Sequence, residues 1–294
     1  MKKSRLLVFA LVAVMAVFAM APVCGAFAAD ESTTLTVSVQ IEGPKEHIVY
    51  APEYEVTINK AADQVTVGDV MRAFDADNEG ITMEITETGY GAYISAINNM
   101  GERAMSVYPG WQLAVNNEGL DTSMDNAKIK DGDELLCVYA AMGMTNPSGY
   151  YVYRDADGKY TLGLVAYGQV NIDKGDYGYY EAPLTGTTVY LDGKVLDGVT
   201  NEEGEIAIPA NLATGGEHII QVERYAEGAV INDDIDAIPA NTPVPNVSRL
   251  SPDTYIEISN FADVPAGNWA ETNIYNLVNL GVINGITLTT FEPK

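Results

Sequence analysis

Four closely spaced turn signals constrain the fold of this chain more than any other feature. Each is an acidic residue followed by glycine, and they lie at residues 157–158, 192–193, 197–198 and 203–204. Such pairs favour the tight turns that join antiparallel strands. The runs between them, such as Val189–Leu191 and Ile219–Val222, are short and rich in β-branched residues, as strands are. We therefore expect residues 146–232 to form a small β-sandwich of the immunoglobulin or prealbumin type.

Residues 30–145 combine the periodicities of strand and helix. Leu35–Ile41 alternates apolar and polar side chains, which predicts a half-buried strand. Residues 66–76 carry apolar side chains at helical spacing, at Val67, Val70, Met71 and Phe74. Thr66 lies three residues before Asp69, so we expect a capped helix start. The whole chain is predicted to be mainly β, with an α+β first domain.

The first residues have the pattern of a signal peptide. An apolar run of sixteen residues, Leu6–Ala21, follows three basic residues and precedes a small-x-small cleavage site at residues 26–28. A transmembrane anchor is the alternative, but sixteen apolar residues are short for a span. We expect residues 1–29 to be removed on export, and no membrane span in the mature chain.

Charge and residue chemistry exclude several classes of function. The formal net charge is −25, so nucleic acid and anionic lipid are repelled. His47 and His218 lie beside no Ser or Cys motif, and Cys137 lies inside an apolar strand. The sequence has no Gly-rich phosphate loop and no Cys-x-x-Cys or His-x-x-x-His spacing. We expect a protein that is not an enzyme and that needs no cofactor.

One acidic loop carries part of a calcium-binding pattern. Asp75, Asp77 and Glu79 occupy positions one, three and five of an EF-hand loop. Position twelve is Thr86, where the bidentate glutamate would stand. We therefore expect no metal site, and Asp75 and Asp77 have the alternative role of closing the preceding helix.

Tyrosine is unusually frequent, with eighteen residues against six phenylalanines and two tryptophans. Eight of them crowd one segment, at Tyr150, Tyr151, Tyr153, Tyr160, Tyr167, Tyr177, Tyr179 and Tyr180. They have two interpretations. They stack on sugars or pack on a partner, or they are half-buried strand residues, and we favour the second because tyrosine is common in strands.

Three motifs follow one another between Leu35 and Tyr139. They are Gly89–Ile94 with Ile97–Asn98, Gly110–Trp111 leading to Val115–Asn116, and Lys130–Glu134. With these motifs the segment resembles bacterial surface modules related to the C-terminal β domain of transcobalamin, the cobalamin carrier. The resemblance implies a β-grasp-like fold and, as small ligand, a corrinoid such as cobalamin or another flat molecule. It makes Tyr90, Tyr93 and Trp111 candidate ligand-binding residues, although Trp111 has the alternative role of a core aromatic.

The second domain and the ending carry further resemblances. Thr187–Gly193 and Thr200–Ile206 are similar to carboxypeptidase-regulatory-like and collagen-adhesin B-type sandwiches. The ending resembles a surface-layer homology (SLH) motif, through Phe261–Pro265, Asn268–Ala270, Gly281–Gly285 and Thr290–Pro293. The match covers the first two-thirds of one motif. We therefore expect residues 260–294 to be an incomplete SLH motif, and the chain to be a fragment of a longer protein or the product of a truncated gene.

The SLH resemblance implies a partner and a site. Proteins with such motifs attach to secondary cell-wall polysaccharide, and Asp263 and Trp269 would begin the binding site. Asn268, three residues before Glu271, predicts a capping box. The helix after it has an apolar stripe, at Ala270, Ile274, Leu277 and Val278.

These expectations define two functions. Residues 233–259, which are acidic and punctuated by proline, are expected to form a linker before the motif. The leading hypothesis is a non-enzymatic exported surface protein, attached to the cell wall and displaying the transcobalamin-like module. The alternative is a ligand-capture protein whose 35–139 domain binds a corrinoid, a sugar or a peptide.

Overall fold

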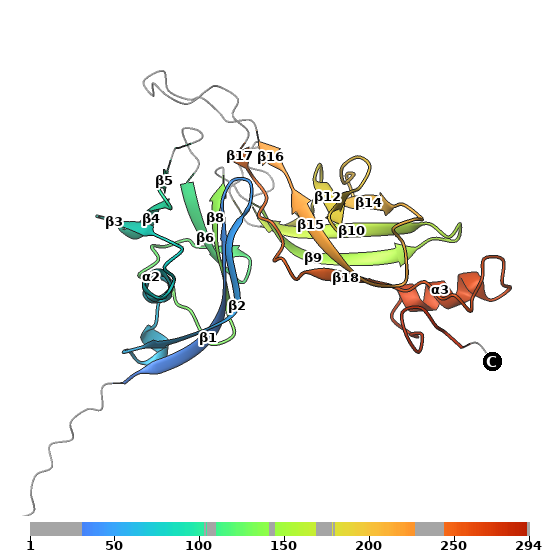
Figure 1. Cartoon of the computed structure of the whole chain (residues 1–294), viewed down its shortest axis with the longest axis horizontal. Helices are drawn as coiled ribbons and strands as arrows, with labels where there is room; N and C mark the ends of the chain where they lie inside the picture. Colours follow the sequence, from blue (N-terminus) through green and yellow to red (C-terminus); the bar gives the residue numbers. More distant parts are fainter. Residues whose placement is uncertain are drawn as a thin grey trace, which may run out of the picture.

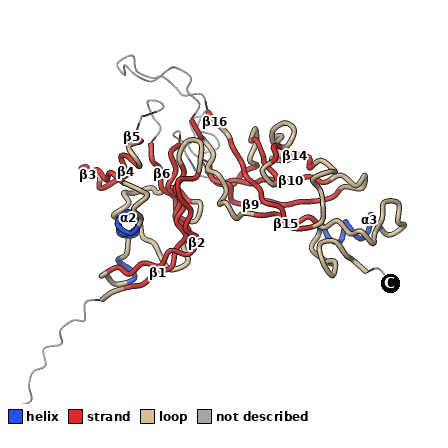
Figure 2. The backbone as a smooth tube through the Cα atoms, viewed as in Figure 1, coloured by secondary structure: helices blue, strands red, loops and turns tan. Residues whose placement is uncertain are grey.

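The computed structural model describes residues 31–292 apart from residue 103 and residues 105–109, 141–144, 169–177, 179 and 227–243. The predicted signal peptide lies outside this part. Strands dominate, and the mainly β class is confirmed (Figure 2). Two bodies, residues 33–140 and 145–258, lie side by side, and a C-terminal helix sits at the far end of the second (Figure 1). Within the described residues, no helix is long and apolar enough to cross a membrane.

The first body is a helix packed on a sheet. It contains β1 (Thr33–Glu42), β2 (His47–Ile58), the 3-10 helix η1 (Ala62–Gln64), α2 (Val67–Asp77), β3 (Met83–Thr88), β4 (Gly91–Ile97), β5 (Met100–Gly101), β6 (Gly110–Val115), β7 (Glu118–Gly119) and β8 (Glu134–Ala140). The main sheet has the order β2-β1-β8-β6-β7, with β1 and β8 parallel at its centre. A smaller sheet has the order β3-β4-β5. This arrangement agrees with the β-grasp-like expectation.

The start of α2 has the predicted cap. The Thr66 hydroxyl accepts the Asp69 backbone N–H at 3.2 Å, and the Asp69 carboxylate accepts the Thr66 N–H at 3.0 Å. The predicted apolar face is buried, and the Phe74 ring meets the Tyr54 ring of β2 edge-on, with 4.9 Å between centroids. The helix is therefore fixed both at its first turn and against the sheet.

The end of β1 departs from the predicted alternation. Its apolar face points into the core as expected, through Leu35, Val37, Val39 and Ile41. Gln40 and Glu42 belong to the opposite face, yet only 8% and 1% of their surface is exposed. The second body covers this face, so the last residues of β1 are buried on both sides.

The second body is a sandwich of two sheets. It contains β9 (Thr145–Arg154), β10 (Tyr160–Gly168), β11 (Tyr180–Pro183), β12 (Thr188–Leu191), β13 (Lys194–Val195), β14 (Glu205–Ile208), β15 (Gly216–Glu223), β16 (Tyr225–Ala226), β17 (Val244–Pro245) and β18 (Tyr255–Ile258). In one sheet β10 pairs with β9, β11 and β14, and the other has the order β13-β12-β15-β18. Asp192 and Gly193 join β12 to β13 with φ values of 49° and 72°, as a tight hairpin turn requires.

The expected linker over residues 233–259 is wrong for its second half. β17 pairs with β16, and β18 pairs with β15 as an edge strand of the sandwich. Val247, Ile256 and Ile258 are buried in the sandwich core. The prolines indicated extended chain correctly, but the apolar residues between them supply an edge strand, where proline can be tolerated. Residues 233–243 lie outside the described part.

The ending forms a small core around α3 (Glu271–Asn279). The predicted capping box is wrong, because Ala270 is the N-cap and makes no side-chain cap bond. Asn268 instead accepts the Ala270 N–H at 2.9 Å, and Glu271 accepts the Gly267 N–H at 2.7 Å. Gly281 ends the helix as predicted, with φ +64° and a Schellman pair of backbone bonds, Gly281 N–H to Val278 and Val282 N–H to Leu277.

The apolar stripe of α3 is as predicted except at Leu277, because Ala270 and Val278 pack against the small core together with Ile274. Ile274 is buried, but Leu277 is 39% exposed, and Tyr275 takes its place in the core. The Tyr275 ring stacks on Phe261 at 5.3 Å, and its hydroxyl accepts the Phe261 N–H at 2.7 Å. Tyrosine satisfies a backbone donor that leucine could not, which explains why Tyr275 is buried in place of Leu277.

Candidate functional site

A cavity of about 220 Å³ lies in the first body, between β4, β6 and the loop after β7. It is lined by Ala92, Tyr93, Ile94, Trp111, Gln112, Leu113, Gly119, Leu120, Thr122, Ser123, Met124 and Asn146. Gly91 brings the loop close to β4, because its φ is +107° and a Cβ there would overlap the Ser123 side chain. Typical small-molecule pockets measure roughly 300–1,000 Å³. This cavity can therefore receive one ring or substituent of a flat ligand, and it cannot enclose a whole corrinoid.

The structure brings together two of the three predicted ligand-binding residues. Tyr93 and Trp111 both line the cavity, whereas Tyr90 is 96% exposed and does not. Trp111 is only 7% exposed, its indole N–H donates to the Met100 carbonyl at 2.9 Å, and its ring meets Tyr139 edge-on. Trp111 thus serves as a core aromatic that forms a wall of the cavity, so both of its proposed roles fall on the same ring.

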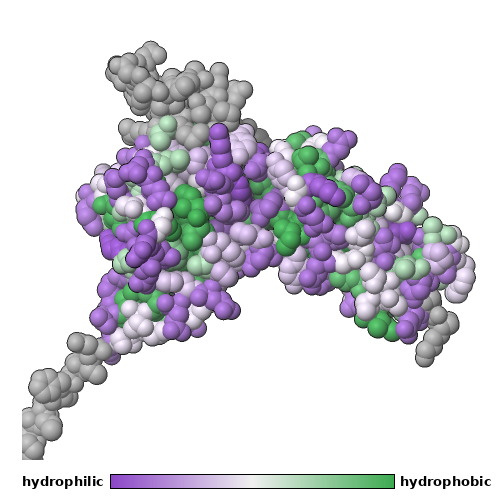
Figure 3. Space-filling model, in the orientation of Figure 1, coloured by the Kyte–Doolittle hydropathy of each residue, from purple (hydrophilic) through white to green (hydrophobic). Residues whose placement is uncertain are grey.

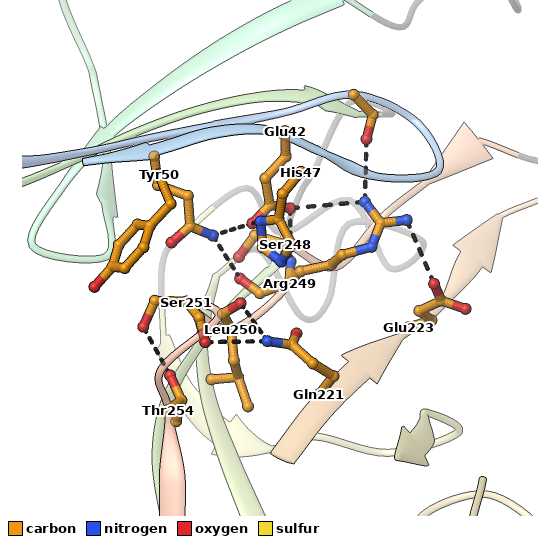
Figure 4. A network of polar contacts seen from close by, with 12 residues as sticks. Glu42, His47, Tyr50, Gln221, Glu223, Ser248, Arg249, Leu250, Ser251 and Thr254 are labelled. Atoms are coloured by element: carbon orange, nitrogen blue, oxygen red, sulfur yellow. Dashed lines mark hydrogen bonds and ion pairs between the residues drawn. The ribbon is translucent and has the colours of Figure 1, made fainter. Parts of the chain in front are cut away.

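A buried polar network joins the two bodies (Figure 4). The Glu42 carboxylate, at the end of β1, accepts the Arg249 backbone N–H at 2.8 Å and a bond from the Gln40 amide. The Arg249 guanidinium lies 4.0 Å from Glu42 and 3.5 Å from Glu223 of β15, and it donates to the Gly43 carbonyl at 3.1 Å. Arg249 is thus bound to the first body by its backbone and by its side chain.

Burial shifts the titration of two groups in this network. It raises the pKa of Glu42 to about 7, against the lowering effect of the Arg249 and Gln40 hydrogen bonds. His47 lies 3.8 Å from Glu42, and burial together with the Arg249 charge lowers its pKa. Both ring nitrogens of His47 lack a hydrogen-bond partner among the described residues. The junction therefore favours a protonated Glu42 below about pH 7 and a neutral His47.

A second and larger cavity, of about 470 Å³, borders this junction. It opens between the bodies and is lined by Ser38, Gln40, Tyr50, Pro52, Asn117, residues 134–136, residues 147–150, residues 248–251 and Thr254. Tyr50 crosses it to donate to the Asp253 carboxylate at 2.9 Å. The lining is mainly polar, and its shape depends on the angle at which the two bodies meet.

The acidic residues at the end of α2 have structural partners. Asp75 accepts the Met83 N–H at 2.8 Å, and Asp77 accepts the Tyr54 hydroxyl at 2.7 Å. Glu79 is exposed on the following turn. In the part of the chain that the structure describes, no group of three or more His, Cys, Asp or Glu residues is placed to hold a metal ion. Asp75 and Asp77 thus tie α2 to β3 and β2, and the bond back to the Phe74 carbonyl at the end of the helix comes from Asn78.

The two residues expected to bind wall polymer have different environments. Asp263 accepts the backbone N–H groups of Phe291, at 2.9 Å, and Glu292, and these bonds hold its pKa below the usual value. Its carboxylate therefore ties the end of the chain to the small C-terminal core. Trp269 is 91% exposed, so its ring is available to a partner.

Sequence reasoning missed the junction. Arg249 was expected in a linker, and Glu42 lies just beyond the strand predicted over Leu35–Ile41. They lie 207 residues apart, and local periodicity carries no information on such a contact. The sequence carries one weak signal of this contact, because Arg249 is an isolated cation in a chain of net charge −25.

Comparison with known proteins bears on the first body. Residues 64–141 match the family described as a domain of unknown function (DUF4430). This match overlaps residues 35–139 from residue 64 onward, and it supports a transcobalamin-like module there. No curated protein matches the chain.

Two solved structures are similar to part of the chain. One is haptocorrin in complex with Cbi, at 17% identity and a TM-score of 0.31, over 37% of this chain and 25% of that one. The other is a candidate metal-binding protein from Ruminococcus gnavus ATCC 29149, at 15% identity and a TM-score of 0.27, over 36% of this chain and 97% of that one. The chain thus corresponds to only a quarter of the haptocorrin chain.

The raised pKa of Glu42 predicts a pH-dependent stability. The folded state keeps a proton that an unfolded glutamate loses near pH 4.5, so the free energy of unfolding should fall as pH rises from about 4.5 to about 7. The loss attributable to Glu42 should reach up to about 3 kcal/mol, at about 1.4 kcal/mol per pH unit. Urea denaturation of the wild type and Glu42→Gln at pH 5, 6, 7 and 8 measures it.

The Glu42→Gln variant keeps an oxygen for the Arg249 N–H but cannot ionise, so the difference between the two proteins isolates Glu42. His47 is present in both. We expect the wild type to lose stability relative to Glu42→Gln as pH rises. A difference that stays constant from pH 5 to pH 8 would show that Glu42 is already ionised at pH 5 or titrates alike in both states.

Proposed function

We propose that this protein is a non-enzymatic exported surface protein that displays its transcobalamin-like module on a β-sandwich stalk attached to the cell wall. The observation that carries the proposal is the buried junction of Glu42 and Arg249. A displayed module needs a defined position on its support. Glu42 and Arg249 are 1% and 9% exposed, and opening the junction would break the buried hydrogen bonds that Arg249 makes to Glu42 and to the Gly43 carbonyl. The signal-peptide pattern supports export, and the SLH resemblance supports the wall as the point of attachment.

The far end of the sandwich supports the same arrangement. Arg154 of β9 forms an ion pair with Glu271 of α3, and its guanidinium lies 4.1 Å from the centre of the Tyr275 ring. Asn279 donates to the Arg154 carbonyl at 2.8 Å. The C-terminal helix is therefore docked on the stalk and does not hang from a linker. The module would thus be fixed to the stalk, and the stalk to the attachment motif, by specific contacts.

The surface of the protein suits this role. The face seen in Figure 3 is mainly hydrophilic, with scattered hydrophobic patches. The net charge of −25 keeps such a surface solvated and separate from anionic lipid. The same charge opposes binding of an anionic wall polymer, so attachment must come from a specific site such as that begun by Trp269.

The attachment is tested by sedimentation with purified cell wall. We compare this chain with a version extended by complete SLH motifs, and with Trp269→Ala in the extended version. We expect the extended chain to pellet, this chain to pellet weakly, and Trp269→Ala to lower the bound fraction several-fold. Tyr255→Ala, which removes a 44% exposed ring from the stalk, is the matched control.

Equal pelleting of the short and extended chains would contradict the requirement for complete motifs. Absence of pelleting by the extended chain would contradict wall attachment itself.

A second candidate function, ligand capture, is favoured by the cavity beside Tyr93 and Trp111. Its lining joins aromatic faces to polar groups, and haptocorrin, which is similar to part of this chain, is described in complex with Cbi. The cavity of about 220 Å³ has room to bind one edge of a corrinoid or of another flat ligand.

Titration with cobalamin, followed by Trp fluorescence or calorimetry, tests the corrinoid form of this function. If it is correct, Tyr93→Ala should weaken binding by about tenfold, which corresponds to about 1.4 kcal/mol, because it removes part of the cavity wall. Tyr90→Ala should have no effect, since Tyr90 is 96% exposed and outside the cavity. Lack of binding at millimolar cobalamin would rule out this form.

A further inference from the structure

Two tyrosines lie on the outer face of the sandwich sheet formed by β9, β10 and β14. Tyr160, Leu162 and Leu164 of β10 point into the core, so Thr161 and Gly163 face outward. In the sheet register Tyr151 of β9 lies opposite Gly163, and Gly163 lies opposite Glu205 of β14. Tyr153 lies opposite Thr161. Tyrosine, glycine and glutamate thus form a row across three strands.

The Tyr151 ring lies flat on this row. A Cβ built at Gly163 would overlap three atoms of the ring, Cζ, Cε1 and Cε2, so the ring covers the glycine directly. Its hydroxyl reaches across β10 and donates to Glu205 at 3.1 Å. With one face against the backbone, the ring turns its other face toward solvent, and 43% of Tyr151 is exposed. Any larger residue at position 163 would lift the ring from the sheet.

Tyr153 extends the same surface. Its hydroxyl donates to the second oxygen of Glu205 at 3.3 Å, and its ring is within 18° of parallel to the Tyr151 ring, with 6.3 Å between centroids. One carboxylate therefore holds both hydroxyls. Two aromatic rings fixed in this way lose little conformational entropy when a ligand covers them. We call Tyr151, Tyr153 and Glu205 the tyrosine platform.

We propose that the tyrosine platform binds a neutral glycan, with sugar rings stacked on the two tyrosine faces. The face of an aromatic ring carries partial negative charge, and the C–H groups on one side of a pyranose are its natural complement. Glu205 can accept hydrogen bonds from sugar hydroxyls beside the rings. Both features serve a ligand that is flat, apolar on its faces and polar at its edges.

The charges around the platform select the kind of glycan. Glu205 lies within it, Glu203 is exposed on the turn before β14, and the chain as a whole is strongly acidic. An anionic polymer or a nucleic acid would be repelled. A protein partner is also disfavoured, because the outward neighbours Thr161 and Ala207 are small and do not extend the rings into a large apolar patch.

The ordinary alternative is that Tyr151 only shields the backbone at Gly163. That role explains a ring over the glycine, but it needs neither the second ring nor the shared carboxylate. If shielding were the only role of Tyr151, Tyr151→Ala would change the stability of the protein, and neither the wild type nor any variant would bind glycan. The two roles are therefore separable by experiment.

The test is affinity electrophoresis of the full chain through gels containing hydroxyethyl cellulose, laminarin or galactomannan, with dextran sulfate as the anionic comparison. We expect retardation by at least one neutral polysaccharide and none by dextran sulfate. Tyr151→Ala and Tyr153→Ala should each weaken the retardation about tenfold, the effect of losing about 1.4 kcal/mol of stacking. Tyr151→Phe keeps the ring and should retain most of the binding.

Tyr255→Ala is the matched control, because Tyr255 is 44% exposed on β18 of the opposite sheet. Circular dichroism identifies variants that fail to fold. If Tyr151→Ala is one of them, the retardation of Tyr151→Phe, which keeps the ring, is compared with that of Tyr153→Ala, which loses one. The proposal is overturned if the wild type passes all three neutral gels without retardation. It is also overturned if a folded Tyr151→Ala binds like the wild type, or if Tyr255→Ala loses as much binding as Tyr151→Ala.

Discussion

The contact between Arg249 and Glu42 is the interaction on which the arrangement of this protein depends. A buried carboxylate is costly unless its oxygens are satisfied, and Glu42 obtains its bonds from the Arg249 N–H and from Gln40. Loss of the Glu42 carboxyl would leave the Arg249 backbone N–H buried without its partner, and an unsatisfied buried donor costs about 1–3 kcal/mol. The bond to the Arg249 backbone also fixes the course of the chain that enters the sandwich before β18. The same network therefore determines the path of the chain at Arg249 and the way in which the two bodies contact each other.

The positions of the candidate sites depend on this junction. The cavity beside Trp111 belongs to the first body, and its lining includes Asn146, which starts the second. Asn146 in turn donates to the Asn117 carbonyl at 2.8 Å and accepts the Ser248 hydroxyl at 2.9 Å. The tyrosine platform lies on the stalk, on the strand that continues from Asn146. A ligand at either place would bind to a surface that is already pre-organised.

Sequence reasoning was accurate where structure is local and incomplete where it is not. The Thr66–Asp69 cap, the Asp192–Gly193 turn and the end of α3 at Gly281 each depend on residues within one turn, and all three are present. Residues 244–258 were expected to form a linker because proline marks extended chain, but the partner strand β15 is distant in sequence. Leu277 was misplaced for the same reason, since Phe261, which lies outside the helix, draws Tyr275 into the core instead.

A distance measurement across the junction tests this account most directly. Spin labels on cysteines placed at the exposed Glu84 and Lys194 report the separation of the bodies, and Cys137 is fully buried and escapes labelling. Electron–electron double resonance should give one narrow distance distribution for the wild type and a broad one for Arg249→Ala. Lys60→Ala, which breaks a surface ion pair, should leave the distribution narrow. Equally narrow distributions with and without Arg249, or a broad distribution in the wild type, would contradict the claim that this junction holds the two bodies together.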